Sequence, residues 1–161
     1  MEQADTLKYL ERLSGTWVGE GTGGYPTIDT FHYREALTFT PAEGKTYLHY
    51  EQRTWLMDES GKDKPSHWET GFLRILANNE IELICAQASG RVEIARGLLT
   101  PTDEGFVLDL RSTQFALDMR VEQTWRELVL RGGFLSHSLQ MQTAAVAALT
   151  QHVQARLHLR D

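Results

Sequence analysis

Residues 15–28 read GTWVGEGTGGYPTI, a stretch in which closely spaced glycines surround one tryptophan and a Tyr-Pro pair follows. Gly19, Gly21 and Gly24 satisfy the G-x-G-x-x-G spacing of dinucleotide-binding loops. Such a loop needs a helix directly after it, whereas Pro26 favours extended backbone in the residue before it and no helical pattern follows. The stretch instead predicts a β-strand thinned by glycines, where something large comes close to the backbone.

The rest of the chain is dominated by apolar and polar residues that alternate with a period of two, as is typical of strands. A short helical pattern comes first, at residues 5–13, with Asp5 or Thr6 as its cap and Gly15 at its end. Turn-forming residues then recur at strand-length intervals. They separate candidate strands at 31–39, 46–56, 66–76, 80–87, 91–100, 106–114, 118–130, 134–144 and 153–159.

These segments predict an all-β fold with one short N-terminal helix. A sheet of this size must close or split to hide its edges, and short hairpins throughout favour a closed antiparallel up-and-down barrel of about ten strands. A barrel wider than about eight strands leaves a cavity, so we expect the function to lie in the lumen. The chain predicts one domain, residues 1–161, with the helix at 5–13 and the barrel at 15–161.

Composition narrows the function further. A net charge of -6 without a basic run argues against nucleic acid and against anionic membrane surfaces as partners. No apolar run approaches the length of a membrane span, and the acidic, polar N-terminus is unlike a secretory signal. The single cysteine, Cys85, cannot form an internal disulfide and is expected to be a small buried residue. We therefore expect a cytoplasmic protein.

The glycine-rich stretch is similar to the signature of the nitrobindin family, small haem-binding β-barrels related in shape to fatty-acid-binding proteins and hence calycin-like. Further blocks resemble motifs of that family in the same order along nearly the whole chain. They are FHYRE at 31–35, YEQRTW at 50–55, HWETGFLR at 67–74, AQASGRVE at 86–93 and LTQHV at 149–153. No single block is decisive, but together they make a specific resemblance.

The resemblance implies one haem b per chain, held by His152 as the axial ligand and the residue on which catalysis depends. It implies reversible nitric oxide binding by ferric haem and isomerisation of peroxynitrite to nitrate, as in a peroxynitrite isomerase. Thr27 would lie close to the haem and His67 on the face opposite the axial ligand. The signature residues Gly15, Trp17, Gly19 and Gly21 would also belong to the cofactor site.

Each of these residues also has a plainer interpretation. His152 shares its strand phase with Gln154, Arg156 and His158, which favours an ordinary surface histidine. Thr27 could serve turn chemistry, and His67 could face solvent from a strand. The residue before His152 is glutamine, where the family often has proline.

A second function stays open from the fold alone, namely a carrier of a fatty acid or another small apolar ligand in the lumen. A buried arginine would favour a ligand with a carboxylate, and the candidates are Arg53, Arg74 and Arg120. A pure interaction domain is the least attractive alternative. A binding surface would not need another group to come so close to the backbone of the glycine-rich stretch. A homodimer also stays open.

Large aromatic residues and one acidic residue complete the predictions. We expect Trp17, Trp55 and Trp125 to pack the barrel wall. Within 31–39, Glu35 breaks an otherwise regular alternation of aromatic and aliphatic residues with polar ones.

Overall fold

The computed structural model describes all 161 residues as two short helical segments followed by ten β-strands. The helix α1 spans Gln3–Leu10, and the 3-10 turn η1 spans Glu11–Leu13. The strands are β1 (Gly15–Tyr25), β2 (Ile28–Pro41), β3 (Tyr47–Met57), β4 (Asp63–Ala77), β5 (Glu80–Gln87), β6 (Arg91–Pro101), β7 (Gly105–Leu117), β8 (Val121–Arg131), β9 (Phe134–Thr143) and β10 (Val146–Leu159).

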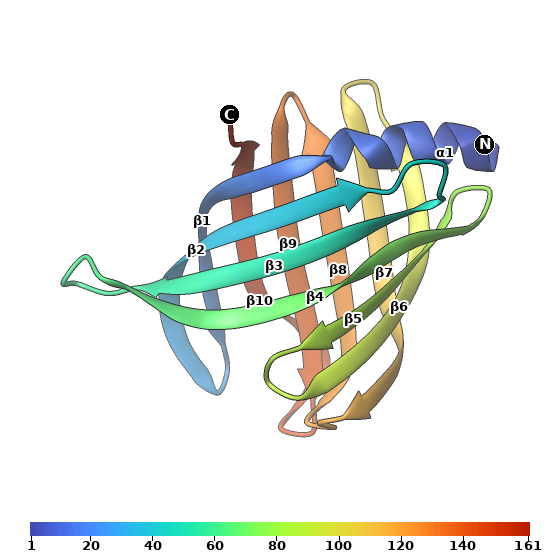
Figure 1. Cartoon of the computed structure of the whole chain (residues 1–161). Coiled ribbons are helices and arrows are strands. Elements are labelled where there is room, and N and C mark those ends of the chain that lie inside the picture. The colour runs from blue at the N-terminus through green and yellow to red at the C-terminus, as the bar shows by residue number, and fades with distance from the viewer.

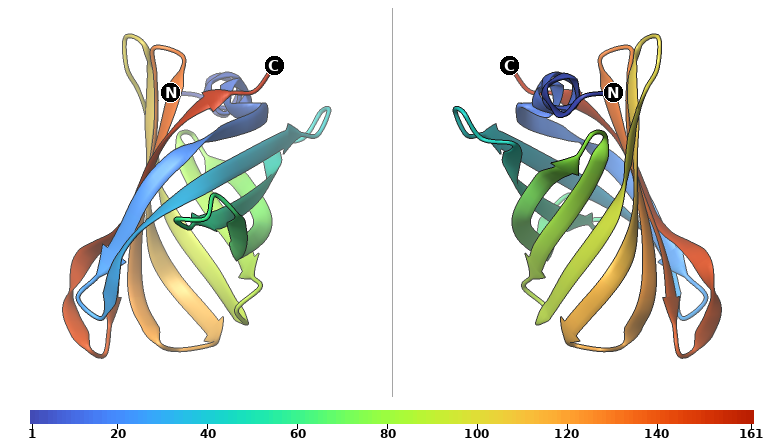
Figure 2. Two further views of the ribbon diagram at one scale, coloured as in Figure 1. Left: turned by 90° about the vertical axis from the view of Figure 1, so that its left-hand side faces the viewer. Right: turned by 90° about the vertical axis from the view of Figure 1, so that its right-hand side faces the viewer.

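Every strand pairs antiparallel with its neighbours in the sequence, and β1 also pairs with β10, which closes the sheet into a barrel. Figures 1 and 2 show the continuous wall that results. Closure leaves no strand with an unpaired edge onto which another strand could add. The predicted up-and-down barrel is confirmed.

Four strands start three or more residues from the positions that the sequence pattern predicts. Strands β2 and β4 start earlier, at Ile28 rather than 31 and at Asp63 rather than 66. Strand β8 starts at residue 121 rather than 118, because Asp118 accepts the backbone N–H of Arg120 at 3.1 Å and forms a turn there. Strand β10 starts at Val146 rather than at residue 153. Its first half escaped prediction because the register against β9 shifts twice within it, so no simple alternation is present.

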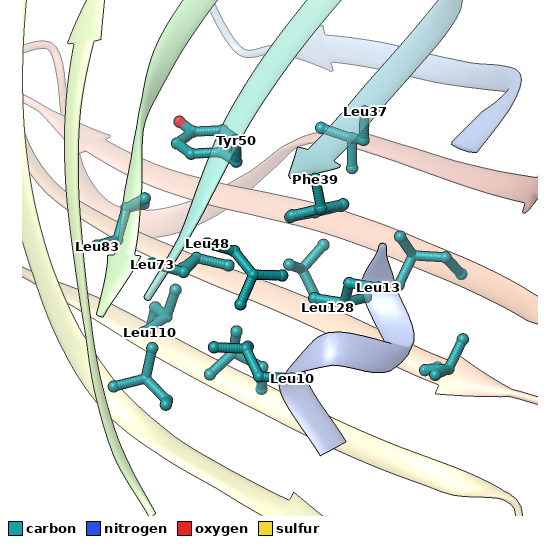
Figure 3. Packing of buried hydrophobic residues seen from close by; sticks show 14 of the residues in the cluster. Leu10, Leu13, Leu37, Phe39, Leu48, Tyr50, Leu73, Leu83, Leu110 and Leu128 are labelled. Atoms are coloured by element: carbon teal, nitrogen blue, oxygen red, sulfur yellow. The ribbon is translucent and has the colours of Figure 1, made fainter. Parts of the chain in front are cut away.

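The helix α1 lies across one end of the barrel (Figure 1). Leu10 and Leu13 are fully buried and reach into the core from that end (Figure 3). The helix begins two residues before the predicted start, and its first turn has no side-chain cap. Thr6 instead donates its hydroxyl to the carbonyl of Asn78 at 2.6 Å, which fastens the helix to the turn between β4 and β5. Neither helical segment has the length and apolar character that crossing a bilayer requires.

The half of the lumen next to α1 is a packed apolar core. Figure 3 shows inward-facing side chains from several strands meeting the helix there, among them Leu37, Phe39, Leu48 and Leu73. Fully burying one such side chain stabilises the fold by about 2 kcal/mol. This end of the barrel therefore holds the fold together and leaves little space for a ligand.

The glycines of β1 allow close packing against both neighbouring strands. A side chain at Gly21 would collide with the ring of Tyr33 on β2 and with the carbonyl of Gln154 on β10. At Gly23, a side chain would collide with the ring of Phe31. The large groups near the glycine-rich backbone are therefore aromatic rings of the neighbouring strand.

Candidate functional site

A cavity of about 420 Å³ occupies the half of the barrel away from α1. Its lining includes residues from the turns at that end: Thr27 between β1 and β2, Ser89 between β5 and β6, and Arg120 between β7 and β8. None of the residues of α1 or η1 contributes to it. The volume falls within the range of small-molecule sites, roughly 300–1,000 Å³.

His152 lines this cavity from β10, and its ring is held by one hydrogen bond. Nδ1 lies 3.0 Å from the carbonyl oxygen of Gly24. Because a carbonyl only accepts, Nδ1 must carry the proton, and the lone pair of the neutral ring is on Nε2. The rings of Tyr25 and Phe31 pack edge-on against the imidazole, with centroid distances of 5.8 and 6.2 Å.

Burial lowers the pKa of His152, and the nearby His67 acts in the same direction, against a smaller opposing effect of the Gly24 carbonyl. The neutral imidazole is therefore favoured. A neutral imidazole with one nitrogen fixed by a hydrogen bond and the other free is the usual form of a metal-binding histidine.

A β-bulge explains why His152 faces inward although its sequence phase predicts the surface. Gln151 pairs with Gln140 on β9 and Val153 with Leu139, so His152 is an extra residue without a partner. Such a bulge changes the direction of a side chain. Both His152 and Val153 line the cavity, whereas the residues that share the sequence phase of His152 are exposed: Gln154, Arg156 and His158.

His67 and Thr27 also line the cavity. His67 lies on β4, four strands from β10 in one direction around the barrel and six in the other, so it reaches the cavity from a different part of the wall. Its Nε2 lies 2.9 Å from Oε2 of Glu69. Thr27 lies in the exposed turn between β1 and β2, next to the strand that supplies Gly24.

The signature residues lie away from the cavity. None of Gly15, Trp17, Gly19 and Gly21 lines it. Trp17 is buried at the closed end, where its Nε1 donates to the carbonyl of Leu13 at 2.7 Å.

The other two tryptophans that we expected to pack the wall are half-buried and outside the apolar core cluster. Arg53 lies 5.9 Å from the ring of Trp55, and Arg111 lies 4.5 Å from the ring of Trp125.

Sequence reasoning missed a layer of buried polar residues between the cavity and the apolar core. Its centre is Arg126, whose Nη1 lies 2.7 Å from Oε1 of Glu69 and whose Nη2 lies 2.7 Å from Oε2 of Glu93. All three side chains are at least nine-tenths buried. The signal was present in the sequence, because Arg126 shares its strand phase with the apolar residues Leu128 and Leu130 of the same strand.

A second buried pair lies beside this layer. Oε1 of Glu35 is 2.8 Å from Nδ1 of His137, and Gln52 donates to the same oxygen at 2.8 Å. Burial alone would raise the pKa of Glu35, but His137 and the hydrogen bond from Gln52 outweigh it and leave the pKa below its ordinary value. Glu35 therefore does not break the alternation of β2. It points inward, as Tyr33 and Leu37 do, and pairs with His137 inside the barrel.

The arginines that the sequence suggested for a ligand carboxylate do not fill that role as a buried cation. Arg53 and Arg74 are exposed, and Arg120 lines the cavity while paired with Asp118 at 2.6 Å. The buried arginine of the lumen is Arg126, and two carboxylates already neutralise it. The cavity thus offers no unpaired buried cation to a fatty acid.

The residues of the cavity fit a haem. The wall that carries His152 has an apolar surface, with Phe31, Leu139, Met141 and Val153. No group of three or more His, Cys, Asp or Glu side chains is placed to hold a bare metal ion. A single histidine with a free Nε2 suits an iron whose other ligands come from a porphyrin.

Comparisons with known proteins identify the family of the chain and the cofactor of that family. Residues 6–159 match the family model described as "THAP4-like, heme-binding beta-barrel domain". The chain is 39% identical over 150 residues to "Peroxynitrite isomerase 1" of Rhodococcus jostii, covering 92% of this chain and 81% of the relative. It is 38% identical over 151 residues to "Peroxynitrite isomerase" of Nocardia farcinica, covering 92% and 87%. The crystal structure of Rv2717c from M. tuberculosis superposes with a TM-score of 0.88 at 34% identity, covering 97% of this chain and 98% of that one.

Proposed function

Because the chain belongs to the family of THAP4-like, haem-binding β-barrel domains, we propose that it binds one haem b through His152 and acts as a peroxynitrite isomerase. The observation that carries the proposal is the state of His152: Nδ1 is committed to the Gly24 carbonyl and Nε2 is free at a cavity wall. The names of the Rhodococcus and Nocardia relatives support the choice of reaction. A ferric haem held there would supply the iron chemistry for nitric oxide binding and for the conversion of peroxynitrite to nitrate.

The protein's own contribution is to hold, orient and shield. Gly24 fixes the ring of His152, while Tyr25 and Phe31 pack against its edges. The apolar side chains on the wall that carries His152 lower the local dielectric on that side of the cavity. His67 reaches the cavity from a different part of the wall and is the polar group that we propose for the face opposite His152.

For Thr27 we propose a contact with the haem edge, because it lines the cavity from the turn beside Gly24. For Gly19 and Gly21 we propose an indirect part in haem binding. Side chains there would collide with the backbone of β10, at Arg156 and Gln154, so these glycines let the strand that carries His152 pack against β1. Gly15 and Trp17 would affect haem binding only by stabilising the end of the barrel next to α1.

We further propose that the protein works on small molecules in the cytoplasm, without a nucleic-acid or membrane partner, in keeping with its net charge of -6. Two copies would need an apolar contact surface. Trp68 and Phe72 on β4 are 47% and 43% exposed, so we propose this face for a homodimer. Sedimentation of the purified protein decides between one copy and two.

A carrier of a fatty acid is the weaker candidate. An extended acyl chain needs a long lumen, whereas here the polar layer around Arg126 and the leucine core close off the half of the barrel near α1. A carboxylate also finds no unpaired buried cation.

Peroxynitrite decay in the presence of ferric, haem-loaded protein tests the proposed reaction. We expect faster decay with nitrate as the product, and loss of most of the acceleration in His152→Ala. His158→Ala is the matched control, since His158 is exposed on the same strand. Equal acceleration by wild type and His152→Ala would contradict the proposal.

A further inference from the structure

A chain of buried ion pairs ends at His67. Glu93 pairs with Arg126, Arg126 pairs with Glu69, and Glu69 accepts from His67 at 2.9 Å. The side chain of Glu69 is 1% exposed, whereas that of His67 is 36% exposed. This series of ion pairs therefore connects the buried polar layer around Arg126 with a residue that lines the cavity.

Both oxygens of Glu69 are committed, so the carboxylate cannot rotate freely. Oε1 accepts from Arg126 Nη1 at 2.7 Å and from the hydroxyl of Tyr50 at 2.5 Å. Oε2 accepts from Arg126 Nη2 at 3.3 Å and from Nε2 of His67. Charge-assisted bonds of this kind are strong and directional. Glu69 is thus a rigid acceptor for His67.

The ionised state of Glu69 decides which nitrogen of His67 carries a proton. Burial alone would raise the pKa of Glu69, but Arg126 and His67 outweigh it and hold the pKa well below its ordinary value. An ionised carboxylate only accepts. Nε2 of His67 must therefore be protonated, and in the neutral ring Nδ1 is the nitrogen left free.

Glu69 is also the only side chain that fastens the ring of His67 by a hydrogen bond. The other bond of this residue joins its backbone N–H to the hydroxyl of Thr54 and leaves the ring free to turn. We propose that Glu69 is the positioning residue of His67: it sets the orientation of the ring and keeps the proton on Nε2, so that Nδ1 is presented to the occupant of the cavity. The proposal rests on the proposed function only for what that occupant is.

Glu69→Gln gives a sharp test in the haem-free protein. Arg126 and Tyr50 donate to residue 69, so the amide oxygen of glutamine is drawn to them and its NH₂ group turns toward His67. His67 must then accept through Nε2, which moves the proton to Nδ1. Nitrogen-15 NMR of the histidine rings should show this tautomer reverse, with the Nδ1–H form rising by about tenfold or more.

Glu93→Gln is the matched control. Glu93 is equally buried and pairs with the same guanidinium, but it does not contact His67. We expect a similar loss of thermal stability in both variants and the wild-type tautomer of His67 in Glu93→Gln only. An unchanged tautomer in Glu69→Gln, or the same reversal in Glu93→Gln, would overturn the proposal.

A second variant covers the case in which Glu69→Gln fails to fold. Glu69→Asp keeps the charge for Arg126 but draws the carboxylate back from His67, so both tautomers should be populated. A single Nε2–H tautomer in Glu69→Asp would count against a positioning role.

The haem-loaded protein then shows whether the orientation of the His67 ring affects the binding of nitric oxide. With Nδ1 protonated, His67 can donate a hydrogen bond to bound nitric oxide. Dissociation of nitric oxide from the haem-loaded Glu69→Gln variant should therefore slow by about fivefold. His67→Ala should abolish this effect of Glu69→Gln, because Glu69 acts through that ring. Failure of the wild-type protein to bind hemin would refute the proposed function, while the haem-free NMR result would still decide the role of Glu69.

Discussion

At the scale of the residue, the proposed haem site depends on protonation states that the surrounding groups impose. Burial lowers the pKa of His152 and so favours the neutral ring, and the Gly24 carbonyl holds Nδ1, which leaves Nε2 as the proposed ligating atom. Glu69 is kept ionised by Arg126 and His67 in spite of its burial. In His152 a hydrogen bond to Gly24 fixes the tautomer, and in Glu69 the ion pair with Arg126 favours the ionised carboxylate.

Cys85 provides a test at the same scale. Burial raises the pKa of its thiol to about 12, with the charge of Glu69 acting in the same direction. Only the thiolate attacks a thiol-reactive probe, so we expect negligible reaction of the native protein at pH 8 and full reaction in denaturant. Cys85→Ser is the blank. Rapid labelling of the native protein would show that the thiol is exposed or ionised and would contradict the packing around it.

The position of a buried residue could be predicted only where the sequence itself indicates what surrounds it. Cys85 was placed correctly as a small buried residue from its apolar neighbours. Glu35 was taken as a break in the alternation, because nothing in the sequence reveals that His137, far along the chain, meets it. Arg126 was overlooked for the same reason, although its phase within β8 pointed inward.

At the scale of the element, β1 and β10 form the support of the site. Gly19, Gly21 and Gly23 leave room for the neighbouring backbone and rings, and β10 pairs with β1 along this stretch. The bulge at His152 then aims that side chain inward. The second half of β10 was predictable from its alternation, but the first half and the bulge were not, because the pairing with β9 shifts there and leaves no local pattern.

Gly21→Ala tests the packing of β1. The added methyl group would meet the Gln154 carbonyl and the Tyr33 ring, so one of them must move. We expect a loss of about 1–3 kcal/mol in the free energy of unfolding, measured by urea denaturation. Gly24→Ala is the control on the same strand, since its nearest contact would be an ordinary 3.5 Å. Equal effects of the two substitutions would contradict the close-approach account.

At the scale of the whole molecule, the barrel is divided into a packed end and an open end. The leucine core under α1 stabilises the fold, and the polar layer around Arg126 lies between it and the cavity. The barrel, the number of its strands and its family were all accessible from the sequence, since alternation and ordered motifs carry that information. The division of the lumen was not, because it depends on which face of each strand points inward.

Titration of the haem-free protein with hemin, followed by absorption spectroscopy, tests the central claim most directly. We expect a saturable Soret band at one haem per chain in wild type and in the surface control His158→Ala. His152→Ala should lose the band of the histidine-ligated iron, because Nε2 of His152 is the proposed ligand. An identical spectrum and affinity in His152→Ala would contradict the account.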